Sequence, residues 1–315
     1  MSSNAHVPVL LGPVLEGLNI RADGCYVDGT FGRGGHSRAI LERLTAAGRL
    51  LAIDRDPQAI ASASKALLSD PRFELVRGEC AQLEKLIADR GLLGRVDGVL
   101  LDLGVSSPQL DEASRGFSFL RDGPLDMRMD PDHGYSAAEW LATVDEKELR
   151  HVLKTYGEER NAARIARAIV AARDEAPIET TMQLADVIAA AAPAHGQKRH
   201  PATKSFQAIR IFINGELDQL QCALEQSVNV LRKPTAPGSG GRLCVISFHS
   251  LEDRLVKRFI REASRESEQF RGMPSVPAEH RPRLKPIGGL VEATDEEVAA
   301  NRRARSARLR VAERL

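Results

Sequence analysis

The sequence predicts an α/β fold: a Rossmann-like sheet, mostly parallel with an antiparallel last strand, and an inserted all-helical domain. Strand-like and helix-like segments alternate over the first third of the chain, a pattern typical of a parallel sheet. The next buried-type strand begins about 140 residues after the fourth one ends, whereas connections of about 2–6 residues are usual. That interval is too long for a loop, so we expect a domain inside it.

The predicted strands differ in pattern along the chain. Residues 96–103 are apolar on both faces, as a central parallel strand requires. Residues 306–313 alternate between apolar and polar side chains and predict the last strand, whereas residues 264–295 are expected to be mainly loop, with a short strand near 284–287. The other strands are expected at 25–27, 49–54, 73–76 and 241–248.

Helical spacing of apolar residues predicts the helices that connect these strands. Pro13 is expected to open the first helix, because the N–H that it lacks would have no partner there. Ser250 is expected to cap a helix over 251–263, since its hydroxyl can accept from a free N–H of the first turn. The other connecting helices are expected at 39–44, 57–67, 83–87 and 214–231.

The long interval between the fourth and fifth strands has a helical pattern of its own. In one of its segments, Ala162, Ile165 and Ile169 share a helical face. We therefore predict a discontinuous domain of residues 1–107 and 213–315, with a helical domain of residues 108–212 inserted into it. The helices of the insert are expected at 136–142, 145–155, 158–174 and 181–192.

Composition excludes several classes of protein. The 315 residues are 43% apolar and 28% charged with a net charge of +1, so any basic surface for nucleic acid must be local. The four cysteines are far apart and form no C-x-x-C pair, which argues against a structural zinc site and against disulfides. The chain shows neither a signal-peptide pattern nor the roughly 18 apolar residues of a membrane helix, and we expect a cytoplasmic protein without a metal.

A glycine-rich turn between the first strand and the helix that follows it predicts a nucleotide-like ligand, because glycines let the backbone approach it. The dinucleotide fingerprint G-x-G-x-x-G fails here, since Ser37 stands where its third glycine is required. An acid followed by G-x-G, as in Asp28, Gly32 and Gly34, fits S-adenosylmethionine methyltransferases. Asp54 ends the second strand, where an acid can accept from two ribose hydroxyls. The alternative is that the glycines serve only a turn and that Asp54 caps a helix.

Polar residues also follow the fourth and fifth strands, and ligands of open α/β sheets bind beyond the carboxyl ends of the strands. Asp102, Ser106, Ser107 and Gln109 follow the fourth strand; they are candidates for the site, and a polar turn is an equally good explanation of them. Residues 247–254 follow the fifth strand and contribute the weaker candidates His249 and Asp253. No G-x-S-x-G elbow accompanies them, which argues against a hydrolase.

Three local basic clusters could contact nucleic acid or could be solvated faces. They lie at residues 198–200, at 257, 258 and 261, and at 302–310. Aromatic residues make up only 4% of the chain, so a broad platform for stacking bases is not expected. Phe117 and Phe119 could still stack on one splayed base.

Motifs across nearly the whole chain resemble the RsmH (MraW) family of bacterial 16S rRNA cytosine-N4 methyltransferases. The N-terminal motifs are His6-Val-Pro-Val-Leu-Leu11, Asp28-Gly-Thr-Phe-Gly-Arg-Gly-Gly-His-Ser37, Asp54-Arg-Asp-Pro57 and Asp102-Leu-Gly-Val-Ser-Ser-Pro-Gln-Leu110. The later ones are Arg115-Gly-Phe-Ser-Phe119, Gly123-Pro-Leu-Asp-Met-Arg-Met129, Tyr156-Gly-Glu-Glu159, His200-Pro-Ala-Thr203, Phe206-Gln207 and Ser247-Phe-His-Ser-Leu-Glu-Asp-Arg254.

The resemblance implies a class I methyltransferase fold, S-adenosyl-L-methionine as methyl donor and S-adenosyl-L-homocysteine as product. It implies a cytosine in the decoding region of 16S rRNA, within the small ribosomal subunit, as acceptor. It places cofactor contacts at Gly34, Gly35, His36, Asp54, Cys80, Asp102 and Gln109. The chain departs from the family at Cys80, where a bulkier residue is usual, so that the adenine contact there would use backbone or apolar surface. It departs also at Arg302, where a proline is usual, a difference that concerns only the local turn.

Methyl transfer from a sulfonium depends mainly on in-line positioning in a dry site. We expect Asp102, Ser106 and Ser107 to hold the amino hydrogens of cytosine, while His249 and Asp253 are weaker candidates for a catalytic role. A nicotinamide oxidoreductase and a non-catalytic RNA-binding module are the rival classes. The first lacks its third glycine here, and the second would not need Asp28, the glycines and Asp54 in cofactor register.

Overall fold

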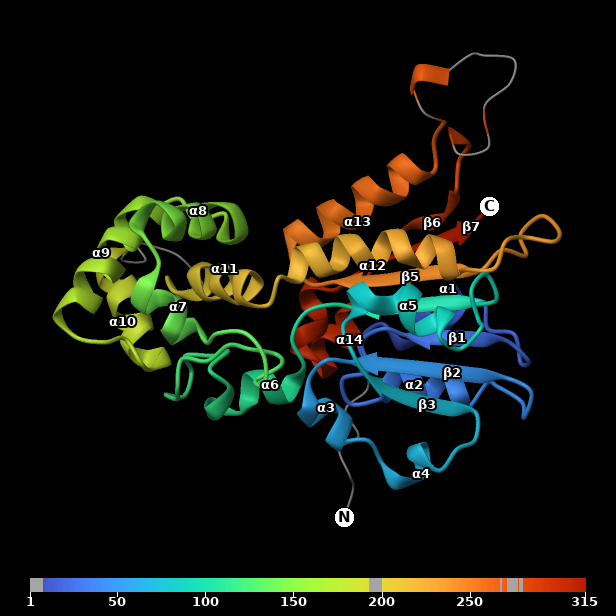
Figure 1. Ribbon diagram of the computed structural model, residues 1–315, viewed down its shortest axis with the longest axis horizontal. Helices are drawn as coiled ribbons and strands as arrows, with labels where there is room; N and C mark the ends of the chain where they lie inside the picture. Colours follow the sequence, from blue (N-terminus) through green and yellow to red (C-terminus); the bar gives the residue numbers. More distant parts are fainter. Residues whose placement is uncertain (1–7, 193–199, 267, 271–276, 278–279) are drawn as a thin grey trace. The chain divides into compact units, whose positions relative to one another are not determined.

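The computed structural model describes residues 8–192, 200–266, 268–270, 277 and 280–315. The chain forms two compact units: unit 1 comprises residues 1–104 and 217–315, and unit 2 comprises residues 105–216. The boundaries predicted from the sequence lie within four residues of these, at 107/108 and 212/213. Unit 1 is an α/β sheet with helices, whereas the regular elements described in unit 2 are helices (Figure 1).

The sheet of unit 1 has seven strands in the order β3-β2-β1-β4-β5-β7-β6. Strands β1 to β5 pair in parallel, and β7 is antiparallel to both of its neighbours, β5 and β6. The predicted sheet, mostly parallel with an antiparallel last strand, is thereby confirmed. In chain order the strands are Cys25–Asp28, Arg49–Asp54, Phe73–Arg77, Gly98–Asp102, Arg242–Ser247, Leu284–Glu292 and Arg308–Arg314.

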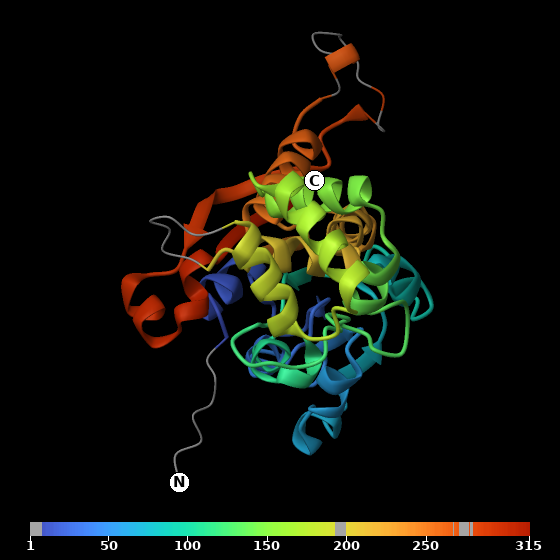
Figure 2. The ribbon, with the colours of Figure 1, turned by 90° about the vertical axis from the view of Figure 1, so that its left-hand side faces the viewer.

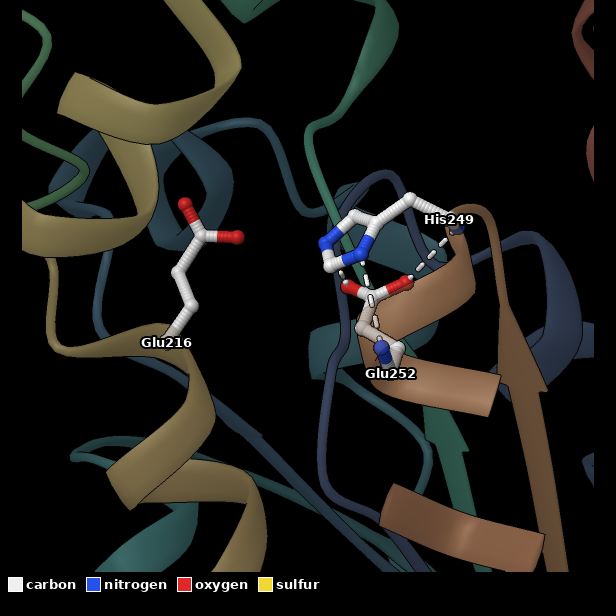
Figure 3. Close-up of side chains that lie close together, drawn as sticks. All are labelled: Glu216, His249 and Glu252. Atoms are coloured by element: carbon white, nitrogen blue, oxygen red, sulfur yellow. Dashed lines mark hydrogen bonds and ion pairs between the residues drawn. The ribbon is translucent and has the colours of Figure 1, made fainter. Parts of the chain in front are cut away.

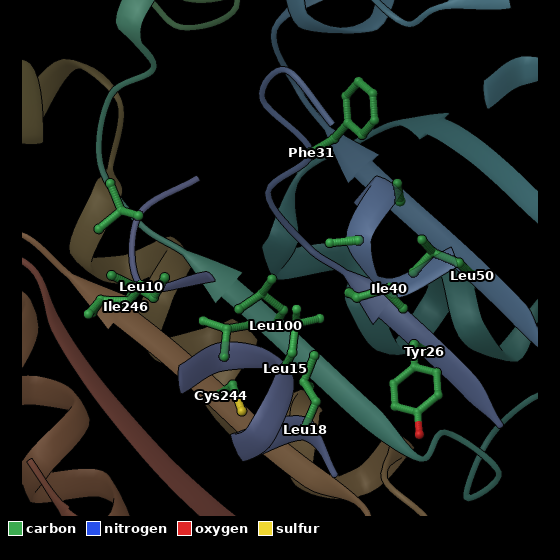
Figure 4. Close-up of a cluster of buried hydrophobic side chains, with 14 of the residues drawn as sticks. Leu10, Leu15, Leu18, Tyr26, Phe31, Ile40, Leu50, Leu100, Cys244 and Ile246 are labelled. Atoms are coloured by element: carbon green, nitrogen blue, oxygen red, sulfur yellow. The ribbon is translucent and has the colours of Figure 1, made fainter. Parts of the chain in front are cut away.

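Both faces of this sheet are covered by helices, which explains why its central strands are apolar throughout. Because successive side chains of a strand point to opposite faces, Tyr26 and Leu100 pack on the side of α1 (Leu11–Leu18) and α2 (Gly35–Leu41), as Figure 4 shows. Residues next to them in the chain, such as Val27 and Val99, face the opposite cluster. That second cluster includes residues of α5 (Leu83–Ala88), α12 (Glu216–Val230) and α13 (Ser250–Ala263).

The prediction of one helix over 57–67 is wrong, because two short helices occupy this segment: α3 (Pro57–Ala61) and α4 (Lys65–Leu68). The Ser62 hydroxyl donates to the Ala59 carbonyl (2.7 Å), and the Ser64 hydroxyl accepts from the N–H of Leu67 (3.2 Å). Serine side chains that bond to local backbone groups offer an alternative to the helical ladder, and here they divide it.

The segment predicted as mainly loop contains a nine-residue strand, β6 (Leu284–Glu292), and a helix, α14 (Asp295–Ala300). Pro286, Gly288 and Gly289 obscure the strand pattern in the sequence. Proline is tolerated in β6 because this strand lies at the edge of the sheet, and Gly288 has a φ of 64° at an irregularity in the pairing with β7. Near the start of the chain, Pro13 is the third residue of α1 rather than the first, still within the turn whose N–H groups have no helical partner.

Unit 2 has its own hydrophobic core, which includes Trp140, Leu149, Ile165, Leu184 and Ile209. Figure 2 shows its helices in green to yellow. The four predicted helices are present, and α11 follows them in a segment for which no helix was predicted. In chain order the helices are α6 (Ser107–Asp111), α7 (Ala137–Thr143), α8 (Glu146–Gly157), α9 (Ala162–Glu175), α10 (Thr181–Ala191) and α11 (Thr203–Ile213). Among the helices of the described residues, none combines the length and the hydrophobicity of a membrane span.

Candidate active site

The carboxylate of Asp28, at the end of β1, holds the glycine-rich turn in place through two hydrogen bonds. One of its carboxylate oxygens accepts from the Ser37 hydroxyl in α2 (2.6 Å) and the other from the N–H of Thr30 (3.2 Å). Burial raises the pKa of this carboxyl, and the hydrogen bond from Ser37 acts against that rise. Asp28 thus ties the strand, the turn and the helix together, and holds the backbone in the shape that a ligand would meet.

The turn needs glycine at two positions because Gly32 and Gly34 have φ angles of 55° and 70°, in the left-handed region. At Gly34 a Cβ atom would lie 2.6 Å from the buried ring of Phe31, which is too close for any other residue. A Cβ atom at Gly35 would overlap the ring of Pro8. The turn is therefore packed on its inner side, while the surroundings of Gly32 are open.

Asp54 lies at the end of β2 and bonds to this turn. Its Oδ2 accepts from the N–H of Gly32 (2.8 Å), and its Oδ1 accepts from the N–H of Asp56 (2.9 Å). Asp56, rather than Asp54, caps α3 by accepting from the N–H of Gln58 (2.9 Å), so the explanation of Asp54 as a helix cap is not what the structure shows. Burial raises the pKa of Asp54 to about 6, although both backbone bonds act to lower it.

His36 and Asp102 meet where α2 approaches the end of β4. The Nε2 atom of His36 lies 3.0 Å from the carbonyl oxygen of Val9, and its Nδ1 atom lies 3.5 Å from Oδ2 of Asp102. Burial lowers the pKa of the imidazole, but the carboxylates of Asp102 and Asp28 more than offset this and leave the pKa raised. Both ring nitrogens face acceptors, which is the arrangement that favours an imidazolium.

Asp102 has one oxygen that the described residues do not satisfy. Its backbone N–H donates to the Thr30 hydroxyl (2.6 Å), and Oδ2 faces His36. Oδ1 is buried and has no hydrogen-bond partner among the described residues. Buried polar atoms without a partner are uncommon, so this acceptor at the carboxyl edge of the sheet is suited to a donor supplied by a ligand.

Cys80 follows β3 and begins a short 3₁₀ helix, Cys80–Gln82. Burial raises the pKa of its thiol to about 11, so that the side chain is neutral and apolar at neutral pH. Two glutamines of α12 hold this segment. The Gln219 side chain accepts from the N–H of Ala81 (3.2 Å), and the Gln226 side chain donates to the carbonyl oxygen of the same residue (2.6 Å).

The same two glutamines also bond on either side of Ala81. Gln219 donates to the Glu79 carboxylate (2.8 Å), and Gln226 accepts from the N–H of Glu84 (2.9 Å). Sequence reasoning did not identify these glutamines. Their separation of seven residues, two turns of a helix, is the only sequence signal that could have suggested a common role.

His249 follows β5 and caps α13, a role that the sequence had assigned to Ser250. The N–H of Glu252 donates to His249 Nδ1 (3.4 Å), and the Glu252 carboxylate accepts from the N–H groups of Phe248 (2.8 Å) and His249 (3.2 Å). Figure 3 shows this pair, in which His249 Nε2 lies 3.2 Å from Glu252. Glu216, also drawn there, belongs to unit 2 and forms an ion pair with Arg210 (2.8 Å).

Asp253, the other weak candidate beyond β5, forms ion pairs with two arginines of β7. Its carboxylate accepts from Arg310 (2.7 Å) and from Arg308 (3.3 Å). Burial acts to raise the pKa of this carboxyl, but the two guanidinium groups outweigh it and lower the pKa. These contacts give Asp253 a structural task in joining α13 to the sheet.

Ser106, Ser107 and Gln109 lie in unit 2, at the start of α6. Ser106 and Gln109 form a capping box, in which the Gln109 side chain accepts from the N–H of Ser106 (2.8 Å). Gln109 is buried. The structure thus shows a local helix-capping task for two of these residues, while their predicted contacts with a ligand stay predictions.

The two phenylalanines predicted to stack on a base also lie in unit 2, and both have partners there. Phe117 is buried, with the guanidinium of Arg115 5.7 Å from its ring centre, so it is not available to a base. The ring of Phe119 lies 4.6 Å from that of His200 and 4.8 Å from that of Phe206. Phe119 packs against the hydrophobic core of unit 2.

The basic clusters differ in how their charges are used. Lys198 and Arg199 lie outside the described residues. In the last cluster, Arg308 and Arg310 pair with Asp253. In the middle cluster, Lys257 and Arg261 are exposed on α13, and in the last cluster Arg302 and Arg305 are exposed.

Residues 3–315 match the model of the MraW methylase family. Similar solved structures include one from Clostridium thermocellum provisionally named an rRNA methylase (12% identity, 98% and 99% of the two chains, TM-score 0.45) and an rRNA methylase from Streptococcus thermophilus (12%, 99% and 99%, 0.39). A further one is a provisionally named methyltransferase from Streptococcus mutans in complex with SAH (11%, 98% and 100%, 0.42).

Proposed function

Because the chain belongs to the MraW methylase family, a family of S-adenosylmethionine-dependent methyltransferases, we propose that it methylates N4 of a cytosine in the decoding region of 16S rRNA. Family membership supports the coarser statement, that the chain is an S-adenosylmethionine-dependent methyltransferase acting in rRNA methylation. The particular base, the small ribosomal subunit as partner and a cytoplasmic location belong to the proposal.

The observation that carries the proposal is the free oxygen of Asp102. It is a buried acceptor without a partner among the described residues, at the edge of the sheet where ligands of such folds bind. The exocyclic amino group of cytosine is a donor of matching chemistry. An acceptor that holds one amino hydrogen orients the nitrogen lone pair and withdraws it from conjugation with the ring.

The residues of unit 1 also fit the methyl donor. Asp54 keeps acceptor capacity for ribose hydroxyls, since each of its oxygens accepts only one backbone bond in the structure and a carboxylate offers about four lone-pair sites. The open surroundings of Gly32 let the backbone of the turn approach a ligand, next to Gly34 and Gly35. When bound, S-adenosylmethionine supplies an electrophilic methyl group on a cationic sulfur.

The remaining predicted contacts belong to the proposed site as well. Cys80 offers a neutral, apolar edge after β3 for the adenine ring, and His36 holds Asp102 in place. Gln109 is proposed as a further cofactor contact, and Ser106 and Ser107 are proposed to bind the acceptor base. Unit 2, to which these three residues belong, is proposed to dock the RNA.

The experiment that tests this function is mass spectrometry of 16S rRNA from cells that lack the gene. We expect N4-methylcytidine in the decoding region to disappear and to return with a plasmid copy of the wild-type gene. Purified protein with tritiated S-adenosylmethionine should then label either deproteinised 16S rRNA or assembled small subunits, and comparison of the two identifies the true acceptor. Persistence of the modified cytidine in the deletion strain would contradict the proposal.

A further inference from the structure

The exposed face of α13 and the turn directly after it carry a row of cations that the site described above does not use. Lys257 and Arg261 lie four residues apart, one above the other, on α13, and Arg265 follows two residues after the helix ends at Ala263. All three are exposed, and the opposite face of the helix is buried through Val256 and Ile260. At about 1.5 Å per residue, Lys257 and Arg261 lie about 6 Å apart along the helix axis.

These three charges have no ion-pair partner among the described residues, although carboxylates lie close by in the sequence. Glu262 on the same helix pairs instead with Arg258 (3.7 Å). Lys257 and Arg261, like charges four residues apart on α13, repel one another and destabilise the helix, so the row is unfavourable until an anion approaches it. The protein keeps a fixed line of positive charge there at a cost to α13.

The end of the row opens into a cavity of about 520 Å³. Arg261 and Arg265 line it together with Arg281 and Arg283 from the segment that leads into β6. Three carboxylates also line it, namely Glu225, Glu262 and Glu266. Of these, Glu225 forms an ion pair with Arg283 (2.9 Å), and Glu262 forms one with Arg258.

Arginine suits this position because its planar group can hold two oxygens of one phosphate, whereas lysine acts as a point charge. The cavity has four arginines against three carboxylates, and the row on α13 adds Lys257 outside it. The whole chain has a net charge of +1, so this positive charge is a local excess and not part of a generally basic surface. The chemistry that it fits is a chain of phosphodiesters.

We propose that the row Lys257–Arg261–Arg265 and the arginine-lined cavity at its end bind the phosphate backbone of the substrate RNA. The proposal rests on the proposed function, since it takes rRNA as the substrate. Helix α13 begins at Ser250, shortly after β5 ends at Ser247, so the row leads away from the carboxyl edge of the sheet where the methyl group is transferred. RNA flanking the target base would be held along this helix, and the contacts would fix its register without reading its sequence.

The test variant changes Lys257→Gln, Arg261→Gln and Arg265→Gln together. Methyl transfer to small ribosomal subunits is measured at several salt concentrations, along with the Kd for S-adenosylhomocysteine. We expect KM for the RNA substrate to rise about tenfold or more near physiological salt, with kcat and the Kd for S-adenosylhomocysteine unchanged. The plot of log affinity against log salt has a negative slope, and its magnitude should become smaller by about two. Each phosphate contact on a single strand contributes about 0.7, and the variant loses three.

A matched control removes three charges elsewhere on unit 1, by Lys65→Gln, Lys85→Gln and Arg95→Gln. These residues are exposed and have no ion pair among the described residues. The control should keep the KM and the salt slope of the wild type, because the chain then loses the same net charge without losing the row.

A charge-conserving variant, Lys257→Arg with Arg261→Lys and Arg265→Lys, should retain most of the affinity for RNA. If the neutralised variant instead behaves like the control, or if it loses only its binding to vesicles containing phosphatidylserine, the assignment of this surface to RNA is overturned. If wild-type protein transfers no methyl group to the subunits, the proposed function fails; binding of the same rRNA fragment, measured by fluorescence anisotropy, then still decides the role of the row.

Discussion

The imidazole of His36 lies 3.5 Å from the carboxylate of Asp102 and joins the first turn of α2 to the end of β4. The two residues are 66 positions apart in the sequence and meet because β1 and β4 are neighbouring parallel strands. Oδ2 of Asp102 faces this imidazole, while Oδ1 has no partner among the described residues. One carboxylate oxygen is thus held by His36, while the other, buried oxygen keeps its capacity to accept a hydrogen bond from a ligand.

Replacement of Asp102 by asparagine should lower the pKa of His36, because burial alone favours the neutral imidazole and the carboxylate is its main opposing influence. NMR titration of the His36 ring measures this. The same variant should lose nearly all methyl transfer, because the free acceptor becomes weaker or turns into a donor. Asp89→Asn, at an exposed position, is the control. Full activity together with normal cofactor affinity in Asp102→Asn would contradict the role assigned to Asp102.

Cofactor affinity should fall as the pH drops through the pKa of Asp54, about 6, because a protonated carboxyl accepts fewer hydrogen bonds from ribose. Calorimetric titration with S-adenosylhomocysteine between pH 5 and 8 tests this, and Asp54→Asn should give weaker binding with a flatter pH profile. If the variant keeps the pH profile of the wild type, another group is responsible.

The same carboxyl has the opposite effect on the stability of the ligand-free protein. Its pKa is raised from 3.8 to about 6 on folding, so the folded state binds more protons than the unfolded state between these values. The contribution of Asp54 to stability is therefore full below pH 3.8 and is lost as the pH rises through 6. Urea denaturation of wild type and Asp54→Asn over this range should show that the difference between them changes with pH in this direction.

Gly34→Ala should destabilise unit 1 by about 2–4 kcal/mol, from the left-handed backbone and the overlap with Phe31. Thermal unfolding measures it, and binding of S-adenosylhomocysteine should weaken because the turn must shift. Gly12→Ala is the control, since Gly12 lies in α1 with open space around its Cβ position. That substitution should stabilise the protein by about 0.5–1 kcal/mol. Equal behaviour of the two variants would contradict the argument.

Gln219→Ala and Gln226→Ala together should raise the Kd for S-adenosylhomocysteine about three- to tenfold, because they release the segment around Cys80 that is proposed to contact adenine. Each variant alone should cost about 1 kcal/mol of stability through its lost hydrogen bonds. Gln221→Ala, on the exposed face of the same helix, should change neither quantity. A double variant with wild-type affinity for the ligand would limit the glutamines to a structural role.

The sheet was predictable because its central strands are continuous apolar runs that the helix pattern does not share. The structure places the strand predicted at 49–54 at those residues, since an exposed Arg49 and an acid, Asp54, mark its ends. The sequence predicted only a short strand near 284–287, whereas β6 has nine residues. Pro286 and Gly288 usually argue against a strand, but an edge position tolerates them. Propensity alone could not reveal that this strand would be an edge.

Within the candidate site, the sequence identified the residues that follow the strands, but not the hydrogen bonds that connect them. Asp28 was expected in a cofactor pattern, and the structure shows it buried under the turn, bonded to Ser37. The capping of α13 by His249 rather than Ser250 depends on the Glu252 side chain turning back toward the helix start. Such reciprocal bonds depend on side-chain directions, which residue types alone do not specify.

The position of β7 between β5 and β6 determines the order in which the sheet can assemble during synthesis. Although β6 is made before β7, it pairs only with β7, so it has no place in the sheet until the later strand has emerged from the ribosome. A nascent chain stalled after β6 would leave the edge of β5 unpaired and available to other chains. Asp253, which is made before its partners Arg308 and Arg310, would remain without them over the same interval.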